Sequence, residues 1–217
     1  MMKSILFVVN VDWFFISHRL PIALKAMEQG YNVGIVTTVT HHREELESHG
    51  LKVHDLTISR GSSNVISTVY MFFKLLIIFY SLKPDIIHLV TIKPVLVGGL
   101  AAIFLKCKGL VFSISGMGYV FIQTGIINFF RRKIVSLLYR ISLSKKNMKV
   151  IFQNISDKRL VSKIANLKNE KMTIIKGSGV DLDKFQFSEL SDDPIILLAS
   201  RMLVDKGVID FVEAAKI

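Results

Sequence analysis

Several polar side chains that could bind a ligand stand just after apolar runs of this sequence. Carboxylate, imidazole, guanidinium, ammonium and hydroxyl groups can pair with charged groups or hydrogen-bond a polar ligand. The candidates are Asp12, His18, Arg19, Lys93, Ser115, Gly116 and Gly118. If the apolar runs are parallel strands, their carboxyl ends meet at one edge of a sheet, which is where ligands of such sheets bind. The spacing therefore predicts one polar site built from segments that are distant in sequence.

Each candidate also has a structural interpretation. His18 and Arg19 open a helix whose first turn contains Pro21, so they could be ordinary surface residues. His88, inside the run IIHLV, is equally well explained as a core histidine. The first loop, residues 10–21, has no glycine. The glycine fingerprint that binds dinucleotides is therefore missing there, which disfavours nicotinamide or flavin chemistry.

The elements that must position these residues are short apolar strands alternating with longer helical segments. The predicted strands are 4–10, 33–37, 52–56, 86–90, 110–114, 149–153 and 172–176. The predicted helices are 18–29, 41–49, 64–82, 93–106, 126–146 and 156–166. This alternation is typical of βαβ units, so the sequence predicts an α/β fold, a Rossmann-like, doubly wound parallel sheet.

The charge is strongly basic and unevenly distributed. The net charge is +11, and no acidic residue occurs between Asp85 and Asp157. Such asymmetry predicts a polyanionic partner: nucleic acid, anionic lipid headgroups or a phosphorylated substrate. The alternative is a basic surface without a partner. The lone Cys107 permits no disulfide framework within the chain, which fits a reducing, intracellular setting.

Two helical segments have the composition of membrane-contacting helices. Residues 64–84 are apolar nearly all round, but Lys74 lies near the centre, where a charge costs roughly 2.5–3.5 kcal/mol on insertion scales. A spanning helix there would also separate its flanking strands across the bilayer. Residues 127–149 combine apolar side chains with a basic cluster, predicted to contact the membrane, of Arg131, Arg132 and Lys133. A core helix with a solvated charged face explains this second segment equally well.

The alternation of strand and helix segments restarts after a segment rich in Gly, Ser and Asp. We expect one domain over residues 1–180, an interdomain linker over 181–194, and the first βα unit of a second domain over 195–217. That unit would comprise a strand at 194–200 and a helix from residue 208 onward. The helix reaches the end of the chain without a C-cap signal, which predicts a truncated second domain.

Several motifs resemble glycosyltransferase family 4, retaining enzymes of the GT-B fold, especially those that assemble O-antigen or capsule on polyprenyl diphosphate. They occur in the family's order along the chain: HRLPIALKAMEQGYNV, PDIIHLVTIKP, GMGYVF, FQNISD, GSGVDLDKF and ASRMLVDKG. The last two are the most specific, because they form the family's interdomain signature.

The resemblance implies roles for particular residues. Arg201 and Lys206 would bind the diphosphate of a nucleotide-sugar donor, UDP-linked, where negative charge develops as the leaving group departs. The N-terminal domain would hold the acceptor in a cleft lined by the seven candidates named above. No metal or further cofactor is implied, and no catalytic residue is assigned. Ser115 takes the place where many members carry a histidine, so a role resting on that histidine is not transferred.

The sequence thus predicts a hexosyl- or N-acetylhexosaminyltransferase of bacterial surface-polysaccharide synthesis. It would act on a polyprenyl-diphosphate-linked acceptor, peripherally at the inner, anionic face of the cytoplasmic membrane. The family's glutamate pair, which holds the donor, has no counterpart in these 217 residues, so we expect the chain to be inactive alone. The alternatives are a nucleotide-sugar 2-epimerase of the same fold and a basic nucleic-acid-binding module. No readable nucleic-acid motif supports the second alternative.

Overall fold

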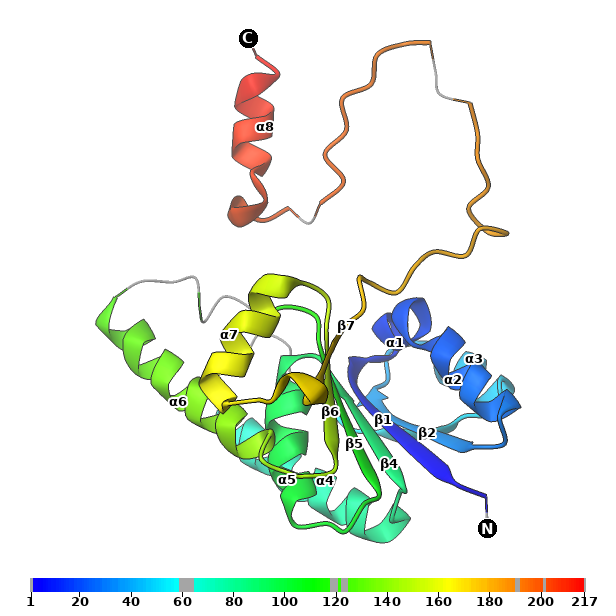
Figure 1. Ribbon diagram of the computed structural model, residues 1–217. Helices are drawn as coiled ribbons and strands as arrows, with labels where there is room; N and C mark the ends of the chain where they lie inside the picture. The colour runs from blue at the N-terminus through cyan, green and yellow to red at the C-terminus, as the bar shows by residue number, and fades with distance from the viewer. Residues whose placement is uncertain are drawn as a thin grey trace. The chain divides into compact units, whose positions relative to one another are not determined.

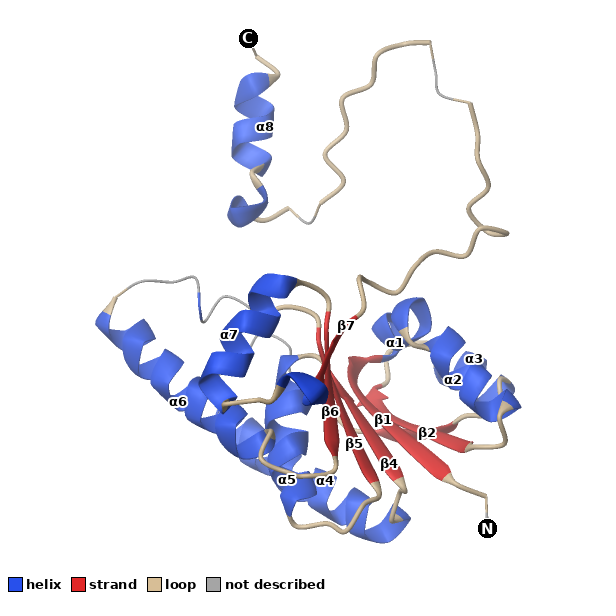
Figure 2. Ribbon diagram, in the orientation of Figure 1, coloured by secondary structure: helices blue, strands red, loops and turns tan. Residues whose placement is uncertain are grey.

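Apolar runs rich in β-branched and aromatic residues pair as a seven-stranded parallel sheet in the computed structural model (Figures 1 and 2). The structure describes residues 2–58, 65–117, 121, 125–189, 192–200 and 202–216. The strands are β1 (Ser4–Val11), β2 (Asn32–Thr38), β3 (Lys52–Asp55), β4 (Ile86–Val90), β5 (Gly109–Ile114), β6 (Met148–Phe152) and β7 (Met172–Ile174). Their order is β3-β2-β1-β4-β5-β6-β7. All seven predicted strands are confirmed, with ends that differ by two residues at most.

Helices cover both faces of this sheet. Side chains alternate along β1, so Leu6 and Val8 belong to one apolar core and Phe7 and Val9 to the other. Helices α1 (Asp12–His18), α2 (Leu20–Glu28) and α3 (Arg43–Ser48) pack on the Phe7 face. On the Leu6 face lie α4 (Val65–Leu82), the π-helical turn η1 (Pro94–Gly98), α5 (Gly99–Ile103), α6 (Ile126–Ser142) and α7 (Ile155–Ala165). This is the doubly wound arrangement that the alternation predicts.

Helix α1 was not predicted, because residues 10–21 have the composition of a loop. Phe15 is fully buried and its ring meets that of Phe7 edge-on, with centroids 5.5 Å apart. The helix ends at Arg19, whose backbone angles (φ −132°, ψ −17°) leave the helical region before α2 begins. Burial of one aromatic ring on the sheet therefore organises this segment as two helices and not as a loop followed by one.

The carboxylate of Asp12 joins the first two crossovers of the sheet. It is fully buried. Its Oδ2 accepts the backbone N–H groups of Thr40 (2.6 Å), His41 (3.2 Å) and His42 (3.2 Å). Its Oδ1 accepts the Thr40 hydroxyl (2.6 Å) and the N–H of Trp13 (2.8 Å). Burial raises the pKa of this carboxyl, but the hydrogen bonds from Thr40, His42 and Trp13 outweigh it and lower the pKa to about 2.

Two adjacent glycines let the η1–α5 segment approach its neighbours. A Cβ on Gly98 would lie 2.7 Å from a methyl of Leu89 on β4. A Cβ on Gly99 would lie 2.7 Å from the Cβ of Ser142 on α6 and 3.0 Å from the ring of Phe112 on β5. Only a residue without a Cβ allows α5 to lie this close to α6.

The chain divides into two compact units, Met1–Gly179 and Val180–Ile217. The described part of the second unit has two regular elements, η4 (Val204–Lys206) and α8 (Val208–Ala214). The helix predicted from residue 208 is therefore present, but the strand predicted at 194–200 is wrong. A strand needs a neighbour to satisfy its N–H and C=O groups. The described residues of this unit supply no second strand, and Ile195, Ile196 and Leu197 are exposed.

Replacing Asp12 by Asn is expected to lower the free energy of unfolding by about 2–3 kcal/mol at pH 7, because an amide cannot accept all five hydrogen bonds. The pKa is lower in the folded chain than in the unfolded one. The stability from Asp12 is therefore present above pH 4 and lost as the pH falls toward 2. The difference in the free energy of unfolding between Asp12→Asn and the unaltered chain, measured by urea unfolding, should narrow as the pH falls from 4 toward 2. The control is Asp183→Asn, at an exposed position; a pH-independent difference would refute this account.

Replacing Gly99 by Ala is expected to lower the free energy of unfolding by about 1–2 kcal/mol. Overpacking against Ser142 and Phe112 outweighs alanine's better helix propensity, which is worth about 1 kcal/mol. Thermal unfolding measures the change. The matched control is Gly109→Ala, where the nearest side-chain atom to a new Cβ lies 3.5 Å away. A more stable Gly99→Ala chain would show that α5 and α6 pack less closely than described.

Candidate functional site

The carboxyl ends of β4 to β7 surround a small cavity whose lining combines polar side chains with isoleucines. It has a volume of about 160 Å³, and its polar lining includes Arg19, His88, Ser115, Gln153 and Ser178. These residues come from the junction of α1 and α2, from strands β4 to β6 or the positions directly after them, and from the segment after β7. Pockets for whole drug-sized ligands measure roughly 300–1,000 Å³, so this cavity suits one group of a larger ligand.

Arg19 brings a buried positive charge to this cavity. Its side chain is 6% exposed. Nη1 donates to the carbonyl of His18 (2.8 Å) and to the Ser178 hydroxyl (3.1 Å). Nε is buried and has no hydrogen-bond partner in the described part of the chain. Desolvation lowers the pKa of Arg19, but a guanidinium remains protonated in proteins.

His88 lies beside this charge as a neutral imidazole. Its Nε2 is 2.7 Å from the Ser113 hydroxyl, and its ring packs on Phe7 with centroids 4.9 Å apart. Burial, and secondarily the charge of Arg19, lower the pKa of His88 to about 3. His88 is thus a core residue, as the structural interpretation holds, and it also forms part of the cavity wall.

The other predicted site residues have different surroundings. Asp12 is buried with all its recorded hydrogen bonds inside the protein, so it positions the loop at residues 40–42 and does not line the cavity. The ring of His18 stacks on Phe14, with centroids 4.2 Å apart, and its Nδ1 lies 2.6 Å from the Ser17 hydroxyl.

Lys93 and Gly116 lie beyond β4 and β5 and do not line this cavity. Lys93 is half-buried, and desolvation lowers its pKa. Gly116 has a φ of 149°. Gly118 and Arg201 lie outside the described residues, and the Lys206 side chain is exposed at the end of η4.

Sequence reasoning missed three polar residues of the cavity: Ser113, Gln153 and Ser178. Gln153 was hidden because the predicted sixth strand ends one residue later than β6 does. Ser178 follows the short β7, and the strand-end rule applied to that strand would have found it. Ser113 lies inside β5, and only its hydrogen bond with His88, which the sequence does not show, identifies it as a residue of the cavity.

Unpartnered polar atoms concentrate at this edge of the sheet. Four buried side-chain atoms of the described residues have no hydrogen-bond partner. Two of them belong to Asn10 and Thr91, at the ends of β1 and β4, and a third belongs to Arg19 in the cavity wall. Thr91 also has a φ of 73°, which is strained for a β-branched residue. Such outliers cluster at binding sites. In the same described ranges, no three His, Cys, Asp or Glu side chains gather where they could hold a metal ion.

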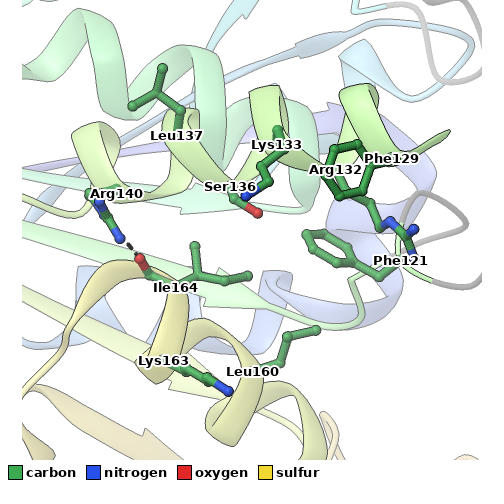
Figure 3. Close-up of a pocket in the computed structure, with 10 residues that line it drawn as sticks. All are labelled: Phe121, Phe129, Arg132, Lys133, Ser136, Leu137, Arg140, Leu160, Lys163 and Ile164. Atoms are coloured by element: carbon green, nitrogen blue, oxygen red, sulfur yellow. Dashed lines mark hydrogen bonds between the residues drawn. The ribbon is translucent and has the colours of Figure 1, made fainter. Parts of the chain in front are cut away.

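A larger groove of about 590 Å³ lies between α6 and α7 (Figure 3). Its walls are apolar, with Phe121, Phe129, Leu137, Leu160 and Ile164. Four cationic side chains line it as well: Arg132, Lys133, Arg140 and Lys163. Arg140 Nε donates to the carbonyl of Ile164 (3.2 Å), the bond drawn in Figure 3. Because no acidic side chain is among the described residues that line the groove, it suits a ligand that is both apolar and anionic.

Helices α4 and α6 expose apolar stripes away from the sheet. On α4, Met71, Leu75 and Phe79 face the core, while Ile66, Val69, Phe73, Ile77 and Tyr80 are exposed. On α6, the exposed stripe is Ile127, Phe130, Ile134, Leu137 and Ile141. By length and composition, α4 is the one helix of the described chain that could cross a membrane. It connects β3 to β4 within one sheet, however, so both of its ends must lie on the same side of a bilayer.

The chain is similar to known glycosyltransferases in sequence and in fold. The chain is 28% identical over 211 residues to N,N'-diacetylbacillosaminyl-diphospho-undecaprenol alpha-1,3-N-acetylgalactosaminyltransferase of Campylobacter jejuni, a match that covers 91% of this chain and 56% of that protein. The chain therefore spans little more than half the length of this curated relative.

Solved structures share the GT-B type of fold. A glycosyltransferase from Rickettsia africae has a TM-score of 0.61 at 20% identity, covering 99% of this chain and 57% of its own. A UDP-GlcNAc 2-epimerase from Neisseria meningitidis has a TM-score of 0.54 at 14% identity, covering 79% and 45%. At these identities the likeness concerns the fold alone. The family model described as glycosyl transferase 4-like matches residues 4–154, well over half of the sequence. The chain thus belongs to the glycosyl transferase 4-like family.

Proposed function

We propose that this chain is the acceptor-binding part of a retaining glycosyltransferase of bacterial surface-polysaccharide synthesis. It would serve transfer of a hexose or N-acetylhexosamine from a nucleotide sugar, UDP-linked, to a polyprenyl-diphosphate-linked acceptor. The observation that carries the proposal is the relative from Campylobacter jejuni, whose name specifies a diphospho-undecaprenol-linked acceptor and which matches 91% of this chain.

The outward stripes support a place at the inner face of the cytoplasmic membrane. Apolar rows on α4 and α6 would be costly in water, and a lipid interface removes that cost. Arg131 and Lys133 are exposed on α6 and Arg132 is half-buried there, and each cation near an anionic bilayer adds about 1 kcal/mol of attraction. We therefore propose that the chain lies on the bilayer through both helices, without crossing it.

The groove between α6 and α7 supports a lipid-linked diphosphate as the acceptor. Its apolar walls suit isoprene units, and its cations suit phosphate oxygens. Because α6 contributes to both the groove and the exposed stripe, an acceptor held there could enter from the lipid phase.

For the donor, we propose that residues 181–194 link the two domains and that residues 195–217 begin the nucleotide-sugar domain. Arg201 and Lys206 would contact the donor diphosphate. As the bond between the anomeric carbon and the diphosphate breaks, negative charge grows on the leaving oxygens, and fixed cations stabilise that transition state. The 217 residues by themselves would bind the acceptor without measurable sugar transfer.

Sugar transfer tests the proposal directly. Radiolabelled nucleotide sugars are supplied with a polyprenyl-diphosphate-linked acceptor to the 217-residue chain and to the same chain extended by a complete donor domain. Only the longer protein should transfer sugar, and Lys206→Ala should reduce its kcat by roughly 10²–10³, as loss of one preorganised donor does in other enzymes. The control is Lys216→Ala, which removes an exposed cation paired with Glu213. Epimerised nucleotide sugar without transfer would instead establish the 2-epimerase, which shares the fold.

Vesicle flotation tests the membrane surface. Changing Arg131, Arg132 and Lys133 together to Glu should abolish flotation with anionic liposomes, because three charges are reversed on a lipid-facing helix, a net change of six units. The matched control changes Lys3, Lys25 and Lys52 to Glu, which alters the charge equally on other elements. Equal loss in both variants would show that net charge alone, and not α6, governs binding.

A further inference from the structure

The buried guanidinium of Arg19 has no counter-charge. No carboxylate lies within ion-pair distance of it in the described part of the chain, and only two groups accept its hydrogen bonds, both at Nη1. Isolated buried charges are costly, and proteins retain them where a partner is supplied. An arginine whose partner is missing from its own fold therefore indicates a bound anion.

The polar side chains around Arg19 suit an oxyanion. His88 is held neutral by its burial and by the nearby guanidinium, so it adds no second charge. Ser115, Gln153 and Ser178 supply hydroxyl and amide groups around the same cavity, and these can donate hydrogen bonds to oxygen. A volume of about 160 Å³ equals on the order of five waters, at ~30 Å³ each. That space admits a phosphate with one attached group.

We infer that this cavity is a phosphate subsite, in which Arg19 donates hydrogen bonds to the oxygens of one phosphate group of a substrate. The choice of phosphate rests on the proposed function, because both proposed substrates carry a diphosphate. Arg19 is well suited to the task, since a guanidinium pairs with phosphate through several fixed donors while a lysine offers a point charge. The phosphate could belong to the nucleotide or to the lipid, and the subsite chemistry is the same.

A phosphate-binding Arg19 and an ordinary structural arginine would affect stability differently. If its role were only to hold the His18 carbonyl and Ser178, its loss would destabilise the chain whatever anion is present. A subsite arginine behaves differently. Removing an uncompensated buried charge leaves the anion-free chain as stable as before or more stable, and it removes the stabilisation that an anion confers by binding the folded state.

Thermal unfolding of the 217-residue chain tests this with pyrophosphate as the probe, against sodium chloride at equal ionic strength and sodium acetate. Pyrophosphate should raise the Tm of the unaltered chain. Arg19→Met should keep or raise the anion-free Tm and lose the pyrophosphate-dependent rise. The control Arg43→Met, at a surface arginine paired with Glu47, should keep that rise. An equal rise in Arg19→Met, or one produced equally by acetate, would overturn the inference.

Two further arms make the result decisive. Titration calorimetry with UDP and with geranyl diphosphate identifies the source of the phosphate: the ligand whose Kd rises roughly 10- to 100-fold in Arg19→Met occupies the subsite. If neither ligand depends on Arg19, the inference is wrong. If Arg19→Met does not fold, Arg19→Lys is used. This variant must also bind the ligand more weakly, because lysine lacks the several fixed donors of a guanidinium. Flotation of the Arg19 variants should be unchanged, so failure here is distinguishable from failure of the membrane proposal.

Discussion

The common direction of the seven strands is the constraint on which the rest of this molecule depends. Parallel pairing requires every connection to return across a face of the sheet, which places α1–α3 on one face and α4–α7 on the other. It also gathers all the carboxyl ends at a single edge. Arg19, His88 and Gln153 are therefore neighbours around one cavity although more than sixty residues separate each from the next.

Two buried charged residues near that edge, Asp12 and Arg19, differ in how many hydrogen-bond partners the protein gives them. Asp12 is surrounded by five donors, and the loop at residues 40–42 is shaped around it, so its charge is used to hold the structure. Arg19 is also buried, but the residues around it offer only a carbonyl and a hydroxyl. The charge of Asp12 is fully hydrogen-bonded within the protein, and that of Arg19 is not. Only Arg19 therefore indicates a bound ligand.

The sheet could be predicted from sequence because its signal is local. Continuous apolar runs such as IIHLV and LVFSI are typical of strands that a parallel sheet buries on both faces. The site was predictable in part. Asp12 and Arg19 were both identified, but their different roles depend on Thr40 and Ser178, which are distant in sequence.

The errors have similar causes. Helix α1 was missed because burial of Phe15 on Phe7 is a tertiary contact. The strand expected at 194–200 has the right composition, but composition alone does not supply a hydrogen-bonding neighbour.

The position of α4 along the chain has a consequence for biosynthesis. Strand β4 pairs with β1, and residues 86–90 leave the ribosome after α4 does. Newly made α4 therefore emerges with Met71, Leu75 and Phe79 exposed as well as its outward row, since the part of the sheet that will cover them does not yet exist. During this interval the helix is apolar nearly all round, and a nearby bilayer competes with water for it. The nascent chain can thus contact a membrane before its domain is complete.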